Sequence, residues 1–205
     1  MSPRPWERLE MNPDLTEIAC ILDRSGSMES IREDAIGGFN AFLKTQREQS
    51  GQARLTLVLF DNEYEVPENG VPLARVKPLD STTFVPRGAT ALYDAIGRTI
   101  NEIGARLARL PEAERPAKVV VAILTDGQEN SSKEFTREAI RSMIEHQRTA
   151  YSWEFVYLAA NQDAVMAASD IAIPAPAAFA FQADNLGIRN AMQMMSAEVT
   201  RRRKA

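Results

Sequence analysis

Three oxygen-bearing residues alternate along a short turn near the start of the chain. Asp23, Ser25 and Ser27 are separated by Arg24 and Gly26, so in an extended loop their side chains point the same way. Gly26 permits a tight backbone path. Carboxylate and hydroxyl oxygens are the ligands that hard cations such as Mg2+ prefer. The turn therefore predicts an oxygen-lined metal site.

Two later segments offer oxygens of the same kind. Thr90 ends the segment GAT at 88–90, ahead of a predicted helix, and Asp126 follows the apolar run VVVAIL at 119–124. Each segment also has a plain structural interpretation, because Ser25, Ser27 or Thr90 can cap a helix and Asp126 can belong to an ordinary turn. Their occurrence together, each at the start of a predicted crossover, favours one metal site. Its candidate ligands are Asp23, Ser25, Ser27, Thr90 and Asp126.

Apolar runs and amphipathic segments alternate along the chain, which is typical of repeated strand–helix units. Strands are expected at 18–22, 55–60, 119–124, 153–159 and 179–182, with short edge strands near 64–66 and 73–76. Helices are expected at 29–49, 91–110, 134–148, 162–170 and 185–201, the third capped by Ser132 or a neighbour. Such units imply parallel pairing with right-handed crossovers. We therefore predict an α/β fold with a doubly wound sheet and helices on both faces.

The predicted fold gives the candidate ligands a common location. Ligands of doubly wound sheets bind outside the C-terminal ends of the strands, where the strand order reverses. Asp23 and Asp126 each end a predicted strand. The fold thus predicts that they approach each other although they are far apart in the sequence.

Other chemistries fit these residues less well. A Ca2+ helix–loop–helix site needs Gly at its sixth position and Glu at its twelfth, where this chain has Met28 and Asp34. An aspartyl-phosphate phosphatase needs a second acid two residues after its nucleophile, and that position is Ser25. The sequence has no glycine-rich phosphate loop. His146, the only histidine, lies late in a predicted helix and is interpreted as a surface residue.

Length and composition indicate an ordinary globular domain. The chain has 205 residues, of which 44% are hydrophobic and 25% charged, and a net charge of -4 gives no general attraction to nucleic acid. One cysteine, Cys20, excludes an internal disulfide and a thiolate metal cluster. Because the first residues contain no apolar stretch and no segment approaches the roughly 18 apolar residues of a membrane span, we expect a soluble, cytoplasmic protein without a membrane partner.

Three motifs in order, DRSGSM at 23–28, GATALYDA at 88–95 and LTDGQEN at 124–130, resemble a von Willebrand factor type A (VWA) domain with an intact metal-ion-dependent adhesion site (MIDAS). The resemblance covers residues 14–200, leaving an N-terminal extension at 1–13 and a basic C-terminal tail at 201–205. It implies a Rossmann-like, mostly parallel six-stranded sheet with one antiparallel edge strand. The chain is most similar to stand-alone bacterial VWA proteins, including those beside tellurite-resistance and phage-associated genes.

The resemblance also implies roles for the residues of the site. Ser25, Ser27 and Thr90 would bind Mg2+ or Mn2+ through their hydroxyls, and Asp23 and Asp126 would bind it directly or through water. An Asp or Glu of a partner protein would fill the sixth position. The leading interpretation is therefore a protein-binding module and not an enzyme. The alternatives are a metal-dependent phosphoester hydrolase and a subunit that assists an AAA+ ATPase or chelatase complex.

Three further expectations concern the surroundings of the site and the end of the chain. Arg24 and Arg87 flank the site and either steer an acidic partner or are plain surface charge. The basic run at 201–204 is interpreted as a solvated tail, with nucleic-acid binding disfavoured. The resemblance implies that the last helix responds to occupancy of the site. Partner identity and oligomeric state stay open.

Overall fold

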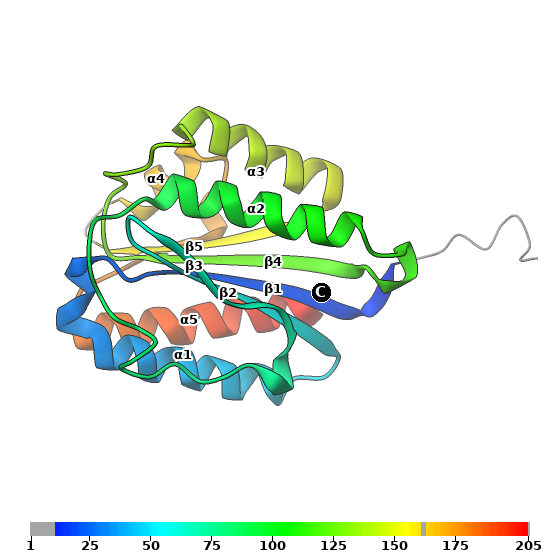
Figure 1. Cartoon of the computed structure of the whole chain (residues 1–205), viewed down its shortest axis with the longest axis horizontal. Coiled ribbons are helices and arrows are strands. Elements are labelled where there is room, and N and C mark those ends of the chain that lie inside the picture. The colour runs from blue at the N-terminus through cyan, green and yellow to red at the C-terminus, as the bar shows by residue number, and fades with distance from the viewer. Residues whose placement is uncertain (1–10, 161–162, 205) are drawn as a thin grey trace, which may run out of the picture.

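The computed structural model describes residues 11–160 and 163–204. Within them, six strands form one sheet with the order β3-β2-β1-β4-β5-β6 (Figure 1). The strands are β1 (Asn12–Asp23), β2 (Gln52–Phe60), β3 (Tyr64–Pro72), β4 (Pro116–Thr125), β5 (Glu154–Ala160) and β6 (Ala178–Phe181). Only β3 is antiparallel to its neighbour. The predicted six-stranded, mostly parallel sheet with one antiparallel edge strand is confirmed.

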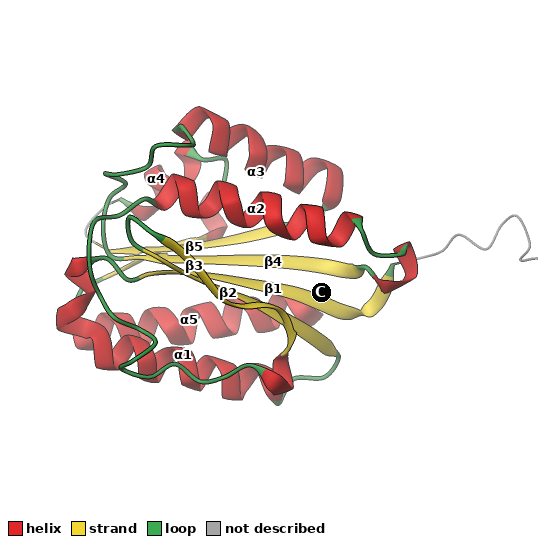
Figure 2. Cartoon of the chain, viewed as in Figure 1, coloured by secondary structure: helices red, strands yellow, loops and turns green. Residues whose placement is uncertain are grey.

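Helices cover both faces of the sheet (Figure 2). One face is covered by α1 (Arg32–Arg47) and α5 (Asn185–Lys204), and the other by α2 (Leu92–Ala108), α3 (Arg137–Tyr151) and α4 (Ala164–Asp170). None of the described helices is both long and apolar enough to span a bilayer. The result is a three-layer α/β domain with two separate apolar cores.

The central strand β1 shows why the apolar runs are continuous. Ile18, Cys20 and Leu22 face the core under α1 and α5, whereas Ala19 and Ile21 face the core under α2 and α3. Because helices cover both faces, successive residues of this strand must all be apolar. Cys20 is fully buried, as expected for an inert core thiol.

The topological switch point of the sheet lies between β1 and β4, and we call the C-terminal edge of these two strands the crevice. These strands are parallel neighbours, and Leu22 is paired with Leu124 in their register. The chain leaves β1 toward α1 on one face and leaves β4 toward α3 on the other. The loops therefore diverge at this point, which is the topological switch where doubly wound sheets bind ligands. Asp23 and Asp126 lie at this edge.

Local boundaries differ from prediction at several points; β1, for example, begins at Asn12 and not at residue 18, so the end of the expected extension at 1–13 belongs to this strand. The helix expected at 29–49 starts as a 3-10 turn (Gly26–Ile31) before α1 begins. The two short edge strands expected near 64–66 and 73–76 are one strand, β3, followed by a 3-10 turn (Leu73–Arg75). Thr136, not Ser132, caps α3, because the Ser132 hydroxyl donates to Glu129.

The basic run at the end of the chain, as far as position 204, belongs to α5; Arg201 and Lys204 are exposed, as expected for a solvated segment, whereas Arg202 and Arg203 are not. Arg202 is only 4% exposed, and its guanidinium lies 3.1 Å from the carboxylate of Glu154. Arg203 donates to the main-chain oxygen of Gln46 in α1 at 2.7 Å. These contacts attach the end of α5 to the sheet and to α1. The expected extension at 1–13 lies mostly outside the described residues, as do position 205 of the tail and position 162 of the short helix expected at 162–170.

Candidate metal centre

The turn after β1 presents a chain of hydroxyl and carboxylate oxygens. The Oγ atoms of Ser25 and Ser27 are 3.1 Å apart, and Ser27 Oγ donates to Asp126 Oδ1 at 2.8 Å. Ser25 is 2% exposed and Asp126 also 2%, whereas Ser27 lies on the solvent side. Two segments that are separated in the sequence by α1, β2, β3, α2 and β4 thus meet at the crevice.

Asp23 lies beneath the two serines and is fully buried. Its Oδ1 accepts from the main-chain N–H of Ser25 at 2.7 Å, and its Oδ2 accepts from the hydroxyl of Thr125 at 2.6 Å. These bonds fix the carboxylate against the turn and against the end of β4. Asp23 therefore connects the two strands that border the crevice.

Thr90 reaches the site from the loop before α2. The backbone of this loop is hydrogen-bonded to the serine turn, residues 23–28, because Gly26 N donates to Gly88 O at 3.2 Å. On the other side Thr90 N donates to Asn130 Oδ1 at 2.9 Å. Its hydroxyl is so close to Gly127 that a Cβ added there would lie 3.2 Å from Thr90 Oγ1. The threonine hydroxyl consequently lies beside the segment that carries Asp126.

Both carboxylates are held in an environment that opposes their charge. Burial raises the pKa of Asp23 to about 6, and the nearby charge of Asp126 adds a smaller contribution in the same direction. Burial also raises the pKa of Asp126, although hydrogen bonds from the serine hydroxyls act against it. Two adjacent buried acids resist ionisation unless a cation neutralises them. The electrostatics of the site therefore favour a bound cation.

The spacing of the oxygens fits an octahedral ion. Mg2+ binds oxygen at 2.0–2.1 Å in near-ideal octahedra, so neighbouring ligand oxygens lie about 3 Å apart. The Ser25–Ser27 and Ser27–Asp126 separations, 3.1 and 2.8 Å, match that edge length. The described residues contain no group of three or more His, Cys, Asp or Glu side chains arranged for a metal. A metal held here would depend on hydroxyl ligands, which this set supplies.

The alternative structural roles of the hydroxyls do not fit the structure. Ser25 precedes the 3-10 turn without a side-chain capping bond, and α2 is preceded by Ala91 and not by Thr90. Ser27 is inside the 3-10 turn, and its hydroxyl is directed to Asp126. These hydroxyls are therefore not occupied as helix caps and remain directed toward the crevice.

The two arginines beside the site both bind acidic residues of this chain. Arg24 is 3% exposed, and its guanidinium binds Asp61 and Glu65. Arg87 binds Asp61, Glu63 and Glu65. Both guanidinium groups are thus engaged by acidic residues of this chain, so steering of a partner and plain surface charge are both wrong for Arg24.

Several residues of the site were missed at the level of sequence. Thr125 binds Asp23, and Asn130 holds Thr90, yet both lie within the LTDGQEN motif that was singled out. Asp61 directly follows β2, as Asp126 follows β4 and as Asp23 ends β1, so the same strand-end signal marks it. Glu129, in the same motif, accepts from Tyr93 N at 2.9 Å.

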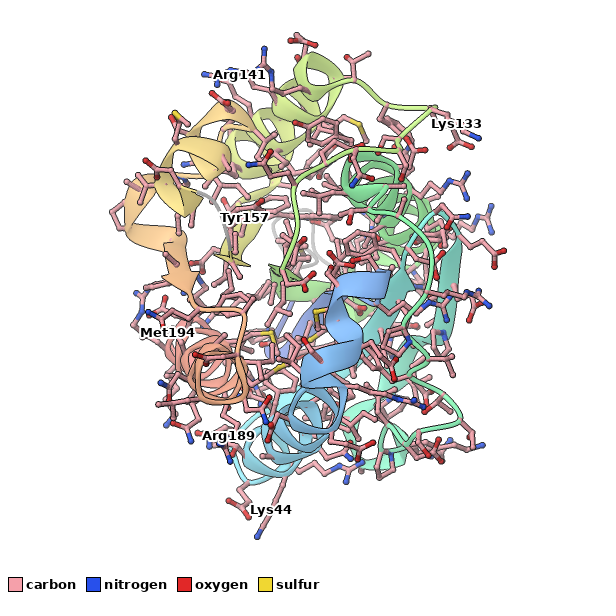
Figure 3. All side chains as sticks on the ribbon, turned by 90° about the vertical axis from the view of Figure 1, so that its left-hand side faces the viewer. Lys44, Lys133, Arg141, Tyr157, Arg189 and Met194 are labelled. Carbon is pink, nitrogen blue, oxygen red and sulfur yellow. The ribbon has the colours of Figure 1, made fainter. Side chains whose placement is uncertain are left out.

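The edge that carries the site faces the viewer in Figure 3. Tyr157 lies near the middle of this view, whereas the basic side chains of Lys44, Lys133 and Arg141 lie at the periphery (Figure 3).

Met194 of α5 is 42% exposed, but its neighbours Met192 and Met195 are buried in the core. The methionines of α5 are thus mainly core residues, as interpreted from the sequence.

No protein-family model matches the sequence, and neither does any curated protein. Solved structures do share its fold. The vWF domain of the type V pili tip protein Mfa5 from Porphyromonas gingivalis matches with a TM-score of 0.65 and 10% identity, covering 90% of this chain and 94% of that one. The ArnB paralog VWA2 from Sulfolobus acidocaldarius matches with a TM-score of 0.53 and 16% identity, covering 86% of this chain and 43% of that one.

A third neighbour includes a metal. Proximal thread matrix protein 1 (PTMP1) from the mussel byssus, with a zinc-occupied MIDAS motif, matches with a TM-score of 0.59 and 18% identity. The match covers 90% of this chain and 46% of PTMP1, so the chain spans about half the length of that protein. Together these neighbours identify the fold as that of a VWA domain. One of them binds a divalent metal at the MIDAS of this fold.

Proposed function

We propose that this chain is a divalent-metal-dependent protein-binding module. Mg2+ or Mn2+ would be held by the hydroxyls of Ser25, Ser27 and Thr90 with the carboxylates of Asp23 and Asp126, and an Asp or Glu of a partner protein would complete its coordination. The observation that carries the proposal is the convergence of two buried acids with the hydroxyls of Ser25 and Ser27, in which the Ser25, Ser27 and Asp126 oxygens are separated by 3.1 and 2.8 Å.

The charge balance supports an external carboxylate. If Asp23 or Asp126 binds through water, most of the direct ligands are neutral hydroxyls, so the ion would keep an affinity for a further anionic oxygen. Ser27 is the exposed member of the set, whereas Asp23 and Thr90 are buried. The side of the ion near Ser27 would therefore face solvent and accept the partner.

The same arrangement favours binding over catalysis. Asp23 and Asp126 are both assigned to the metal, which leaves neither as a general base. The nearby Glu129 uses one carboxylate oxygen for the N–H groups of Ser131 and Ser132 and the other for Tyr93 N. We propose a non-catalytic module on this basis. Assistance to an ATPase complex, a bacterial or tellurite-associated origin and a cytoplasmic location stay predictions from the resemblance.

A chelator-controlled pull-down tests the proposal. Immobilised wild-type protein should retain a partner in Mg2+ and release it in EDTA. Ser27→Ala should lose this retention, because one hydroxyl ligand is gone. The matched control is Ser142→Ala, which removes an exposed hydroxyl on α3 that donates only to Glu138 O. Retention that is equal in EDTA and Mg2+ would refute a metal-dependent module.

A turnover assay separates the module from a hydrolase. Incubation of the wild type with p-nitrophenyl phosphate and Mg2+ should release no p-nitrophenol above the buffer rate. Metal-dependent release that disappears in Asp126→Ala would assign the site to an enzyme instead.

A further inference from the structure

A third acidic residue, Asp61, lies next to the candidate metal centre without belonging to it. It follows β2 directly and is fully buried. Its Oδ2 accepts from the Nε atoms of Arg24 and Arg87, both at 3.0 Å, and its Oδ1 accepts from Glu63 N at 2.6 Å. One carboxylate thus receives two guanidinium groups that come from different segments.

The two arginines belong to the segments that present the hydroxyl ligands. Arg24 lies between Asp23 and Ser25, and Arg87 is three residues before Thr90. The main chains of these segments also meet, since Arg87 N donates to Arg24 O at 2.9 Å. Asp61 therefore joins the serine turn and the threonine loop through their side chains, in parallel with a main-chain bond.

Asp61 and its neighbour Asn62 also contact the threonine loop, the segment at 87–90 that carries Thr90. Asp61 O accepts from Ala91 N at 2.9 Å, directly after Thr90. Gly88 has a φ of +66°, and a Cβ at this position would lie 1.9 Å from Asn62 Oδ1. Thr90 consequently lies between two points fixed by the end of β2.

The charges of Arg24 and Arg87 explain why Asp61 holds these two segments and would not act as a metal ligand. Hydrogen bonds between ionised groups are shorter and about twice as strong as neutral ones. Both guanidinium groups approach Asp61, and the exposed acids Glu63 and Glu65 balance the second positive charge. The carboxylate is thus neutralised by residues of this chain.

We propose that Asp61 is a positioning residue of the metal centre: through Arg24 and Arg87 it sets the distance between the serine turn and Thr90. This inference rests on the proposed metal site. Outer residues that orient metal ligands typically change affinity by about 10–100-fold when they are replaced. Asp61→Asn should therefore weaken binding of Mn2+ about tenfold or more, although Asp61 does not contact the ion.

The test compares two buried carboxylates that both bind arginine. The control, Glu17→Gln, removes the same charge from the pair of Glu17 with Arg106. Glu17 is six residues before Asp23 on β1, which is about 20 Å along a strand. Isothermal titration with Mn2+ measures affinity and thermal melting measures stability. Asp61→Asn should lose affinity, whereas Glu17→Gln should keep the wild-type value even if both variants melt earlier.

A double-mutant cycle tests whether Asp61 acts through Thr90. If it does, Asp61→Asn should weaken Mn2+ binding much less in a Thr90→Ala background than in the wild type, because coupled residues are not additive. Wild-type affinity in Asp61→Asn, or an equal loss in both backgrounds, would overturn the positioning role. If the wild type itself takes up no Mn2+ or Mg2+, it is the proposed metal site that fails. The two failures are therefore distinguishable.

Discussion

Glu17 and Asp23 are both fully buried acids on the same strand, β1, but they have different partners. Glu17 accepts from the guanidinium of Arg106 at 2.7 Å and from the hydroxyl of Thr56 at 2.9 Å. Asp23 accepts from a main-chain N–H and from the hydroxyl of Thr125. One acid meets a cation within the protein, and the other meets only dipoles together with a second acid, Asp126.

The difference separates an acid that is neutralised inside the fold from an acid that we assign to the proposed metal site. The two charges of a buried ion pair neutralise each other inside the protein, so removing one partner lowers the stability of the fold. In the proposed metal site, two neighbouring acids that accept hydrogen bonds from neutral groups would be stabilised further by a bound cation. Replacement of Glu17 should therefore change the stability measured with denaturant. Replacement of Asp23 or Asp126 should change how stability depends on metal ions and pH.

Removal of Glu17 from its ion pair with Arg106 should have the largest effect on stability. Glu17→Ala leaves the partly buried guanidinium of Arg106 without its carboxylate, and we expect the free energy of unfolding to fall by about 3 kcal/mol or more. Urea denaturation measures this loss. The stabilisation by Mg2+ should be unchanged, because Glu17 is remote from the crevice. A change below about 1 kcal/mol would show that the pair contributes no more than a surface ion pair.

Metal ions should stabilise the other region by a similar but smaller amount. A ligand of the native state at 100 times its Kd adds about 2.7 kcal/mol to the free energy of unfolding. We expect this increment with Mg2+ or Mn2+ in the wild type and its loss in Asp126→Asn, which keeps the side-chain volume but not the charge. Melting curves recorded with metal and with EDTA measure it. Equal increments in both proteins would remove Asp126 from the ligand set.

Changing pH in the absence of metal should sharpen the contrast further. The pKa of Asp23 is about 6 in the folded protein and 3.8 for the free side chain, so the folded state binds the proton more tightly. Its stabilising contribution is complete below pH 4 and is lost as the pH rises through about 6. In EDTA, Asp23→Asn should therefore gain stability relative to the wild type between pH 4 and 7, by about 2 kcal/mol.

The control for the pH experiment is the same comparison with saturating Mg2+. There the ion neutralises the carboxylate, so the wild type should no longer lose stability relative to Asp23→Asn as the pH rises. A difference between the two proteins that is independent of pH in EDTA would contradict the raised pKa of Asp23.

The sequence was sufficient for the layers of the fold. Continuous apolar runs predicted strands covered on both faces, and β1 and β4 confirm this because their alternate residues enter two different cores. Apolar residues at helical spacing predicted the buried face of α2, where Ile96, Ile100 and Ile103 lie in the core. These features depend on the local periodicity of apolar residues and on their burial, and both can be predicted from a single sequence.

The five candidate ligands were also predictable as a set, because their residue types and strand-end positions are properties of the sequence. Their meeting in one crevice follows from the parallel order of β1 and β4. Their assignment to a metal stays a proposal that the spacing of the oxygens supports.

Sequence alone determined which residues carry oxygen, which segments are buried and at which edge of the sheet the site must lie. Only the tertiary structure decided where the charges point. Arg24 turns inward to Asp61, Arg203 binds α1, and Thr125 supports Asp23. The physical reason is that a charged side chain takes the lowest-energy partner within its reach, and that partner is brought near by folding and not by its position in the sequence.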